Sequence, residues 1–229
     1  MKSLELALKD SIELRQSILA DKPLQKNIET ATSNLIKVIE QGGTIYSCGN
    51  GGSACDAMHF TEELVARYKK ERVGIKAQHF MDPGTLTCWA NDYIWEGVFE
   101  RQAQTFCGNK DALVVFSTSG NSSNIIKAIE AAKAKGTWVL GLLGKNGGKA
   151  APLCDTSIIV PSAATERIQE IHITLVHMFC EEIEARANLS QNIKTLKPQK
   201  EYLPDEKTLP VEYSTALPGA NISADRIPK

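Results

Sequence analysis

The sequence predicts an α/β protein with a mostly parallel sheet and helices on both faces. Four short segments are apolar almost throughout, as expected for strands buried on both sides: residues 44–48, 111–116, 137–143 and 157–160. Segments with helical periodicity separate them, and two of the strands end in turns rich in glycine and hydroxyl groups. This alternation indicates a three-layer αβα sandwich. Its ligands are expected at the carboxyl ends of the strands.

The 229 residues suffice for one α/β domain with an appendage. Residues 1–40 read as a helical segment, with apolar residues at helical spacing over 4–18 and 24–39 and a break near Pro23. The first helix suits packing on its own domain and on a neighbouring subunit equally well. The domain itself is expected over 41–189, and the proline-rich, aperiodic residues 190–229 are expected to form an extended or disordered tail.

The first polar turn follows the strand at 44–48. Gly49, Gly51 and Gly52 allow a tight turn there, and Ser53 is expected to cap the next helix, with its amide groups aimed at a phosphate. On that helix His59 and Glu63 are four residues apart, in one stripe with Asp56. They could converge on one atom, or they could be a solvated helix pair.

The second polar turn follows the strand at 111–116. Residues 117–124 read Ser-Thr-Ser-Gly-Asn-Ser-Ser-Asn and lead into a helix over 125–135. Hydroxyl and amide donors in such a loop suit a phosphate monoester, although similar clusters also occur in ordinary loops.

Other segments carry weaker signals. A less regular strand is expected at 74–81, a helix at 85–90 ending in a loop at Asn91 and Asp92, and another helix at 95–106. Residues 69–72 read as a solvated, basic helix end. A long helix over 165–187 carries Gln169 and His177 along one side, whereas His79 and His172 are expected to have structural roles.

Composition excludes several classes of function. The chain has 26 basic and 27 acidic residues, so no basic surface for nucleic acid or an anionic membrane is indicated. The six cysteines form no C-x-x-C pair, and no apolar segment is long enough to span a membrane. A cytoplasmic protein with reduced cysteines is expected.

Four segments together carry a specific resemblance. They are residues 48–64 (CGNGGSACDAMHFTEEL), 90–93 (ANDY), 117–122 (STSGNS) and 167–177 (RIQEIHITLVH). In this order they resemble the signature segments of the phosphoheptose isomerases, a family of sugar isomerase (SIS) domains. The resemblance covers about residues 1–187 and leaves out the tail.

The resemblance implies a homotetramer with active sites near subunit interfaces, which converts sedoheptulose 7-phosphate to D-glycero-D-manno-heptose 7-phosphate for heptose biosynthesis. It implies zinc held by His59, Glu63, Gln169 and His177. It implies substrate contacts at Asn50, Gly51, Gly52, Glu63, Asn91, Asp92, Ser117, Thr118, Ser119, Ser122 and Gln169, to which the expected helix start adds Ser53.

The chemistry assigns two roles. Aldose-ketose isomerisation moves a proton between C1 and C2 through an enediol, so it needs a base at carbon and an acid at oxygen. Glu63 is the candidate base and His177 the candidate acid. Two alternatives remain: a phosphosugar-binding regulatory protein without catalysis, as some replication-initiator partners are, and an isomerase of a different phosphosugar.

Overall fold

Five parallel strands form the sheet at the centre of the fold, in the order β2-β1-β3-β4-β5. The computed structural model describes residues 2–187, which belong to one unit. The strands are β1 (Ile45–Gly49), β2 (Ala77–His79), β3 (Ala112–Ser117), β4 (Trp138–Gly144) and β5 (Thr156–Val160). The helices are α1 (Lys2–Ala20), α2 (Lys22–Glu40), α3 (Gly52–Val65), α4 (Pro83–Asp92), α5 (Val98–Phe106), α6 (Ser123–Ala134) and α7 (Thr165–Arg186), with short 3-10 turns η1 (Trp95–Gly97) and η2 (Ala151–Leu153).

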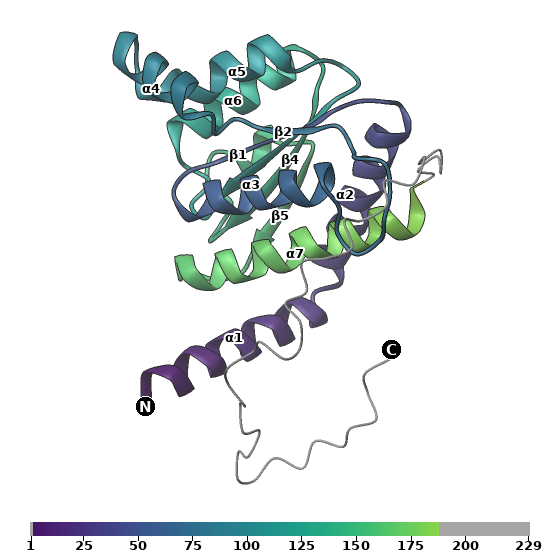
Figure 1. The fold of residues 1–229 in the computed structure, drawn as a ribbon. Coiled ribbons are helices and arrows are strands. Elements are labelled where there is room, and N and C mark those ends of the chain that lie inside the picture. Colours follow the sequence, from purple (N-terminus) through teal and green to yellow (C-terminus); the bar gives the residue numbers. More distant parts are fainter. Residues whose placement is uncertain (1, 188–229) are drawn as a thin grey trace, which may run out of the picture. The chain divides into compact units, whose positions relative to one another are not determined.

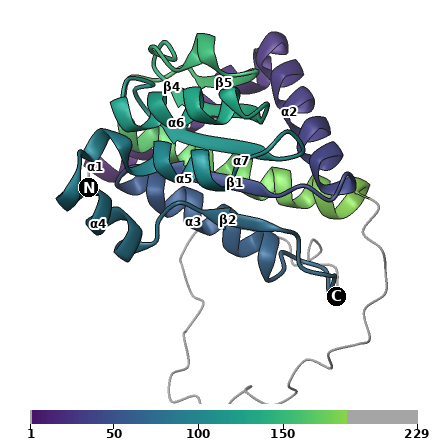
Figure 2. The same cartoon turned by 90° about the horizontal axis from the view of Figure 1, so that it is seen from above.

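Helices cover both faces of the sheet (Figures 1 and 2). Helices α2, α3 and α7 bury one core, which includes Leu35, Phe60 and Phe179. Helices α5 and α6 bury the other, which includes Phe99 and Ile125. The predicted three-layer αβα sandwich with a parallel sheet is therefore confirmed. The predicted tail at 190–229 lies outside the described residues.

Helix α4 differs from the expectation. It begins at Pro83, because the Asp82 side chain caps it by accepting the amide of Thr85 at 2.7 Å. It also continues through Asn91 and Asp92, which the sequence analysis placed in a loop. The amide of Tyr93 donates to the carbonyl oxygen of Trp89, and their rings stack at 4.3 Å, so the last turn stays helical. The loop prediction for this pair was wrong.

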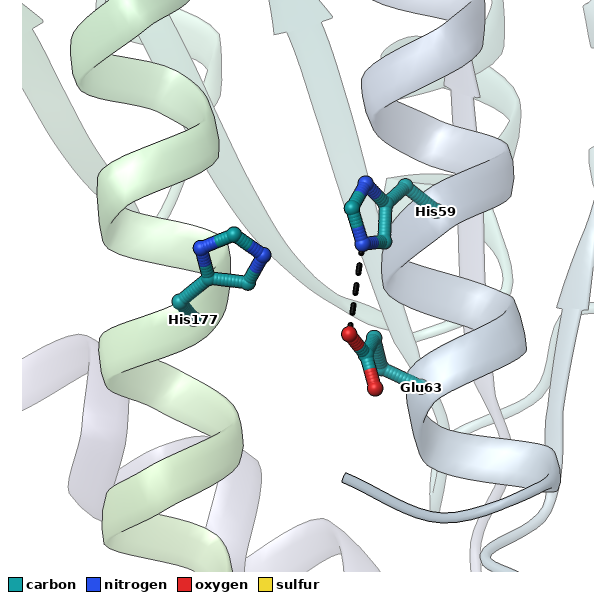
Figure 3. A group of neighbouring side chains, drawn as sticks. All are labelled: His59, Glu63 and His177. Carbon is teal, nitrogen blue, oxygen red and sulfur yellow. Dashed lines mark hydrogen bonds and ion pairs between the residues drawn. The ribbon is translucent and has the colours of Figure 1, made fainter. Parts of the chain in front are cut away.

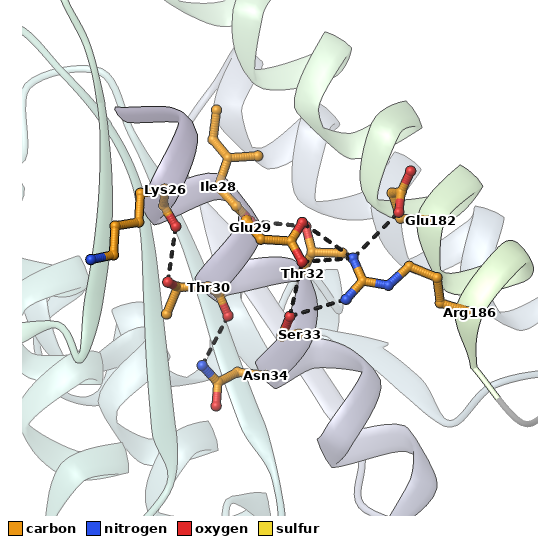
Figure 4. Close-up of polar contacts among 9 residues, drawn as sticks. All are labelled: Lys26, Ile28, Glu29, Thr30, Thr32, Ser33, Asn34, Glu182 and Arg186. Carbon is orange, nitrogen blue, oxygen red and sulfur yellow. Dashed lines mark hydrogen bonds and ion pairs between the residues drawn. The ribbon is translucent and has the colours of Figure 1, made fainter. Parts of the chain in front are cut away.

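The two N-terminal helices pack differently. Helix α2 belongs to the core, and Arg186 of α7 ties its surface to α7 through Glu29, at 3.0 Å, and Ser33 (Figure 4). Among the side chains of α1 whose burial is described, those of residues 3–20, only Leu14 is buried. Five apolar side chains of this helix are more than half exposed: Leu4, Leu6, Leu8, Ile12 and Leu19. Helix α1 thus packs on its own unit and still presents an apolar surface.

Among residues 2–187, no helix combines the length and apolar character needed to cross a bilayer.

His172 links α7 to the sheet. Its ring is completely buried, and Nε2 lies 3.1 Å from the carbonyl oxygen of Leu143, while Nδ1 has no hydrogen-bond partner. Burial lowers the pKa of His172 to about 4, against the smaller opposing effect of the Leu143 carbonyl. The expected structural role of His172 is consistent with this geometry.

Acid should therefore destabilise the fold through His172. The unfolded chain binds the proton near pH 6.5 and the folded chain only near pH 4, so this stability is complete above pH 6.5 and is lost as the pH falls towards 4. At about 1.4 kcal/mol per pKa unit, the loss approaches about 3 kcal/mol. Urea denaturation at pH 7 and 4.5 checks this against His172→Asn, which can donate to Leu143 but does not titrate. An equal acid loss in both proteins would contradict it.

Candidate active site

Three side chains from two helices converge at the seam between α3 and α7 (Figure 3). His59 and Glu63 lie one turn apart on α3, with Nε2 of His59 3.2 Å from Oε1 of Glu63. His177 of α7 faces them, and its ring centre is 5.1 Å from that of His59. One potential ligand atom from each of the three lies within 4.8 Å of the others. Side chains more than a hundred positions apart thus share one site.

The packing of the two helices produces this convergence. Helix α3 buries Phe60 and Leu64, and α7 buries Val176 and Phe179 on the same core. The rings of Phe60 and Phe179 are 6.4 Å apart. Because residues one position away from a buried stripe lie at its edge, the polar groups next to these side chains meet across the seam.

The donor set of this cluster fits zinc. Two imidazoles and one carboxylate are ligands that Zn²⁺ commonly takes, and a fourth position is open to substrate or water in catalytic sites. The Glu63 side chain is 15% exposed and that of His59 is 40% exposed, so the cluster is reached from solvent. The ring of Tyr68 stacks on His177 at 5.9 Å and limits how that imidazole can turn.

A polar pocket lies at the carboxyl end of β3, between the starts of α3 and α6. Its lining is Asn50, Ser53, Phe116, Ser117, Thr118, Ser119 and Ser122. The amide of Gly120 donates to Oγ of Ser117, which shapes the loop. Hydroxyl groups and two helix N-termini make this pocket suited to an anion such as a phosphate.

The turn before α3 differs in one detail from the expectation. Gly51 has φ +57° and occupies the cap position, and Ser53 lies inside the first turn, where it is buried. The prediction that Ser53 caps the helix was wrong, because the left-handed backbone at Gly51 starts the helix earlier. Ser53 nevertheless lines the polar pocket. Asn50 is held by a reciprocal amide pair with Asn124 of α6, at 2.9 and 2.8 Å.

A second hollow lies beside the cluster and contains Gln169. It is lined by Cys55, Asp56, His59, Glu166, Gln169, Glu170 and Ile173. Asp56 is 9% exposed, and its Oδ2 has no hydrogen-bond partner. Burial raises the pKa of Asp56 to about 6, opposed by the charge of His59. Helical spacing predicted Asp56 in one stripe with His59, without a role.

The side-chain amide of Gln169 lies close to the turn before α3, where Gly52 leaves room for it. A Cβ at Gly52 would lie 2.4 Å from Nε2 of Gln169, so only glycine leaves the amide where it is. We expect Gly52→Ala to push this amide aside and to lower turnover about tenfold, as other displaced orienting groups do. The fold should survive, because Gly52 lies within α3, where alanine has a higher helix propensity than glycine, and the displaced atoms end a flexible side chain. Kinetics beside a melting curve checks this, and unchanged kinetics would contradict the role of Gln169.

Asn91 and Asp92 are not brought to this site. They are exposed at the end of α4, where Nδ2 of Asn91 donates to Oδ1 of Asp92. Helix α4 packs with α5, on the opposite face of the sheet from α3 and α7. Within one chain, the other predicted site residues gather around α3, the β3 loop and α7.

The comparisons with known proteins agree with this arrangement. The model of the SIS domain family matches residues 10–144, so the chain is a SIS-domain protein. The phosphoheptose isomerase of Aeromonas salmonicida is 46% identical over 178 residues, which are 77% of this chain and 93% of that protein. The chain belongs to the phosphoheptose isomerase family.

Solved structures show the same relationship. The phosphoheptose isomerase of Neisseria gonorrhoeae superimposes with a TM-score of 0.75 at 35% identity, covering 80% of this chain and 98% of that chain. The enzyme of Francisella tularensis gives a TM-score of 0.77 at 30% identity, with 81% and 98% covered. The resemblance found from the sequence is confirmed.

Proposed function

We propose that this chain isomerises sedoheptulose 7-phosphate to D-glycero-D-manno-heptose 7-phosphate, for heptose of lipopolysaccharide, capsule or related glycans. One observation carries the proposal. His177 of α7 meets Glu63 of α3, and the polar pocket lies at the start of the same helix α3. Ser53 and Glu63 are ten residues apart on α3, which corresponds to about 15 Å along the axis. The Glu63 side chain reaches back towards the pocket, because its Oε1 lies 3.2 Å from Nε2 of His59, one turn nearer the start of the helix.

In the proposed reaction the two ends of the sugar have different partners. Ser117, Thr118, Ser119 and Ser122 donate hydrogen bonds to the phosphate and fix the far end. Glu63 removes the proton from one of C1 and C2 and returns it to the other, through an enediol. His177 moves a proton between the two oxygens. The stacked ring of Tyr68 keeps the imidazole facing Glu63.

A zinc ion fits the same cluster. His59, Glu63 and His177 would hold it, and it would supply polarisation of the sugar oxygens. Gln169, whose amide lies against Gly52 in the adjoining hollow, would turn towards the cluster to serve as a neutral fourth ligand. Coordination lowers the basicity of a carboxylate, so Glu63 acts as the base when it is not bound to the ion.

Metal analysis tests the zinc proposal. Protein prepared without added metal should contain about one zinc per chain, and His59→Ala should lose most of it, since one of three strong ligands is removed. Cys88→Ala, which removes an exposed thiol on α4, serves as the control and should keep its zinc. Equal zinc in wild type and His59→Ala would contradict the assignment.

We further propose a homotetramer with active sites near subunit interfaces. The exposed apolar side chains of α1 and the exposed Tyr93, Ile94 and Trp95 after α4 are surfaces suited to other copies. Asn91 and Asp92 would then contact substrate in a neighbouring subunit. The six free cysteines suit the reducing cytoplasm as its location.

One assay separates the proposed function from its alternatives. Purified protein is supplied with sedoheptulose 7-phosphate, and formation of the aldose is followed, with fructose 6-phosphate and ribulose 5-phosphate as comparison substrates. Turnover of the heptulose phosphate in clear preference is expected. Binding without turnover would indicate the regulatory alternative, and preference for another sugar would indicate a different isomerase.

A further inference from the structure

Arg72 and Glu184 form a buried ion pair next to the cluster of His59, Glu63 and His177. Nε of Arg72 lies 3.0 Å from Oε1 of Glu184, and the side chains are 5% and 3% exposed. The prediction of a solvated helix end at residues 69–72 is therefore wrong for Arg72. Its surroundings explain the difference: a loop after α3 folds back onto α7 and encloses the guanidinium. Removing two charges from water is costly, so such a pair persists where its other hydrogen bonds are satisfied.

The pair satisfies the end of α3 and the loop that follows it. Arg72 donates to the carbonyl oxygens of Glu63 at 2.6 Å, Leu64 at 2.8 Å and Val73 at 3.3 Å. The last carbonyls of a helix lack partners within the helix, so the guanidinium acts as a cap. The carboxylate of Glu184 accepts three successive backbone amides, those of residues 68, 69 and 70, at 3.0–3.2 Å.

These bonds end on the residues that carry the proposed chemistry. Arg72 holds the backbone of Glu63, the candidate base. Glu184 lies two turns after His177, the candidate acid, on the same helix, and holds the backbone of Tyr68. The ring of Tyr68 in turn stacks on His177. The pair therefore joins the end of α3, the loop and α7 at the place where their spacing sets the distance from Glu63 to His177.

We propose that Arg72 and Glu184 are positioning residues, which fix Glu63, Tyr68 and His177 relative to one another for proton transfer. The inference rests on the proposed function for its kinetic consequence. Its geometric consequence, a fixed His177 ring, does not depend on which sugar is turned over. The phosphate pocket lies at the other end of α3, so binding of substrate should be affected little.

Glu184→Gln tests the proposal, because glutamine keeps the shape and removes the charge. We expect kcat to fall about 10- to 100-fold, as for other groups that orient a reacting side chain, with KM within about twofold. The matched control is Glu182→Gln, on the same helix with an exposed ion pair to Arg186. It should leave both constants unchanged. Arg72→Lys keeps the charge but not the planar fork, and should lower kcat in the same way.

A spectroscopic measurement separates positioning from general stability. The chain has four histidines, so the ring signals of His177 can be assigned in NMR spectra with a His177→Gln variant. In folded Glu184→Gln the His177 signals should move, because Tyr68 no longer stacks in one place, while those of His79 should not. If Glu184→Gln does not fold, the double variant Arg72→Met/Glu184→Leu, which leaves no charge unpaired, is used instead.

The outcomes separate two failures. A folded variant with full kcat and unmoved His177 signals would overturn the positioning role, whatever the substrate. A wild-type chain without turnover of sedoheptulose 7-phosphate would overturn the proposed function alone. In that case moved His177 signals would still support the positioning role, and unmoved ones would overturn it.

Discussion

Glu63→Gln is expected to lower kcat for sedoheptulose 7-phosphate by about 100- to 10,000-fold, the range that general acid-base groups contribute. The amide keeps the size of the side chain and can still contact the sugar, but it cannot take a proton from carbon. His177→Gln should cause a loss of the same order, because no other described imidazole except that of His59 lies in the cluster. Substrate binding should persist, since the phosphate pocket is untouched.

Matched substitutions make this result interpretable. Glu62→Gln changes the neighbouring, exposed residue of α3, and His79→Gln changes a histidine of β2. Both should retain turnover close to that of wild type. Steady-state kinetics, substrate titration by calorimetry and zinc content are measured on all five proteins. Turnover near wild type in Glu63→Gln or His177→Gln would remove that residue from the proposed mechanism.

Gly120→Ala is expected to have the largest effect on the phosphate loop. Gly120 has φ +63°, and a Cβ there would lie 2.0 Å from the carbonyl oxygen of Gly147, which is backbone and cannot move aside cheaply. The left-handed conformation costs about 1–2 kcal/mol for alanine, and overpacking adds about 1–3 kcal/mol. The loop around Ser119 should shift, and KM should rise more than kcat falls.

Gly42→Ala isolates the effect of the clash. Gly42 also has a left-handed backbone, φ +73°, but a Cβ there would meet nothing within 4 Å. It follows α2, away from both the pocket and the cluster. This variant should lose about 1–2 kcal/mol of stability and keep its KM. Equal stability losses and equal KM values in the two variants would contradict the packing described at Gly120.

The sequence was sufficient for the fold because its signals are local. The apolar segments around residues 45–49 and 112–117 end in glycine and hydroxyl turns, and such patterns specify a strand followed by a helix without distant partners. The stripe of His59 and Glu63 was also visible as helical spacing. That His177 faces this stripe followed from the family resemblance, since no local pattern pairs two helices.

The residues that were missed depend on tertiary packing. The burial of Arg72 results from a loop that folds onto Glu184, more than a hundred positions away, and its local sequence is that of a solvated helix end. Asp56 was visible only as part of a stripe with His59 and Glu63, and helical spacing does not reveal that it is 9% exposed and lines a hollow together with Gln169 of α7. The last residues of α4, Asn91 and Asp92, were predicted as a loop because Asn and Asp are common in turns. Periodicity alone carries no information about such contacts.

The most direct test is a crystal structure of the chain with the product aldose 7-phosphate bound. The phosphate is expected among the side chains of Ser117, Thr118, Ser119 and Ser122, with the C1 and C2 end of the sugar between Glu63 and His177. A phosphate bound elsewhere, or a C1 and C2 end pointing away from both side chains, would contradict this expectation.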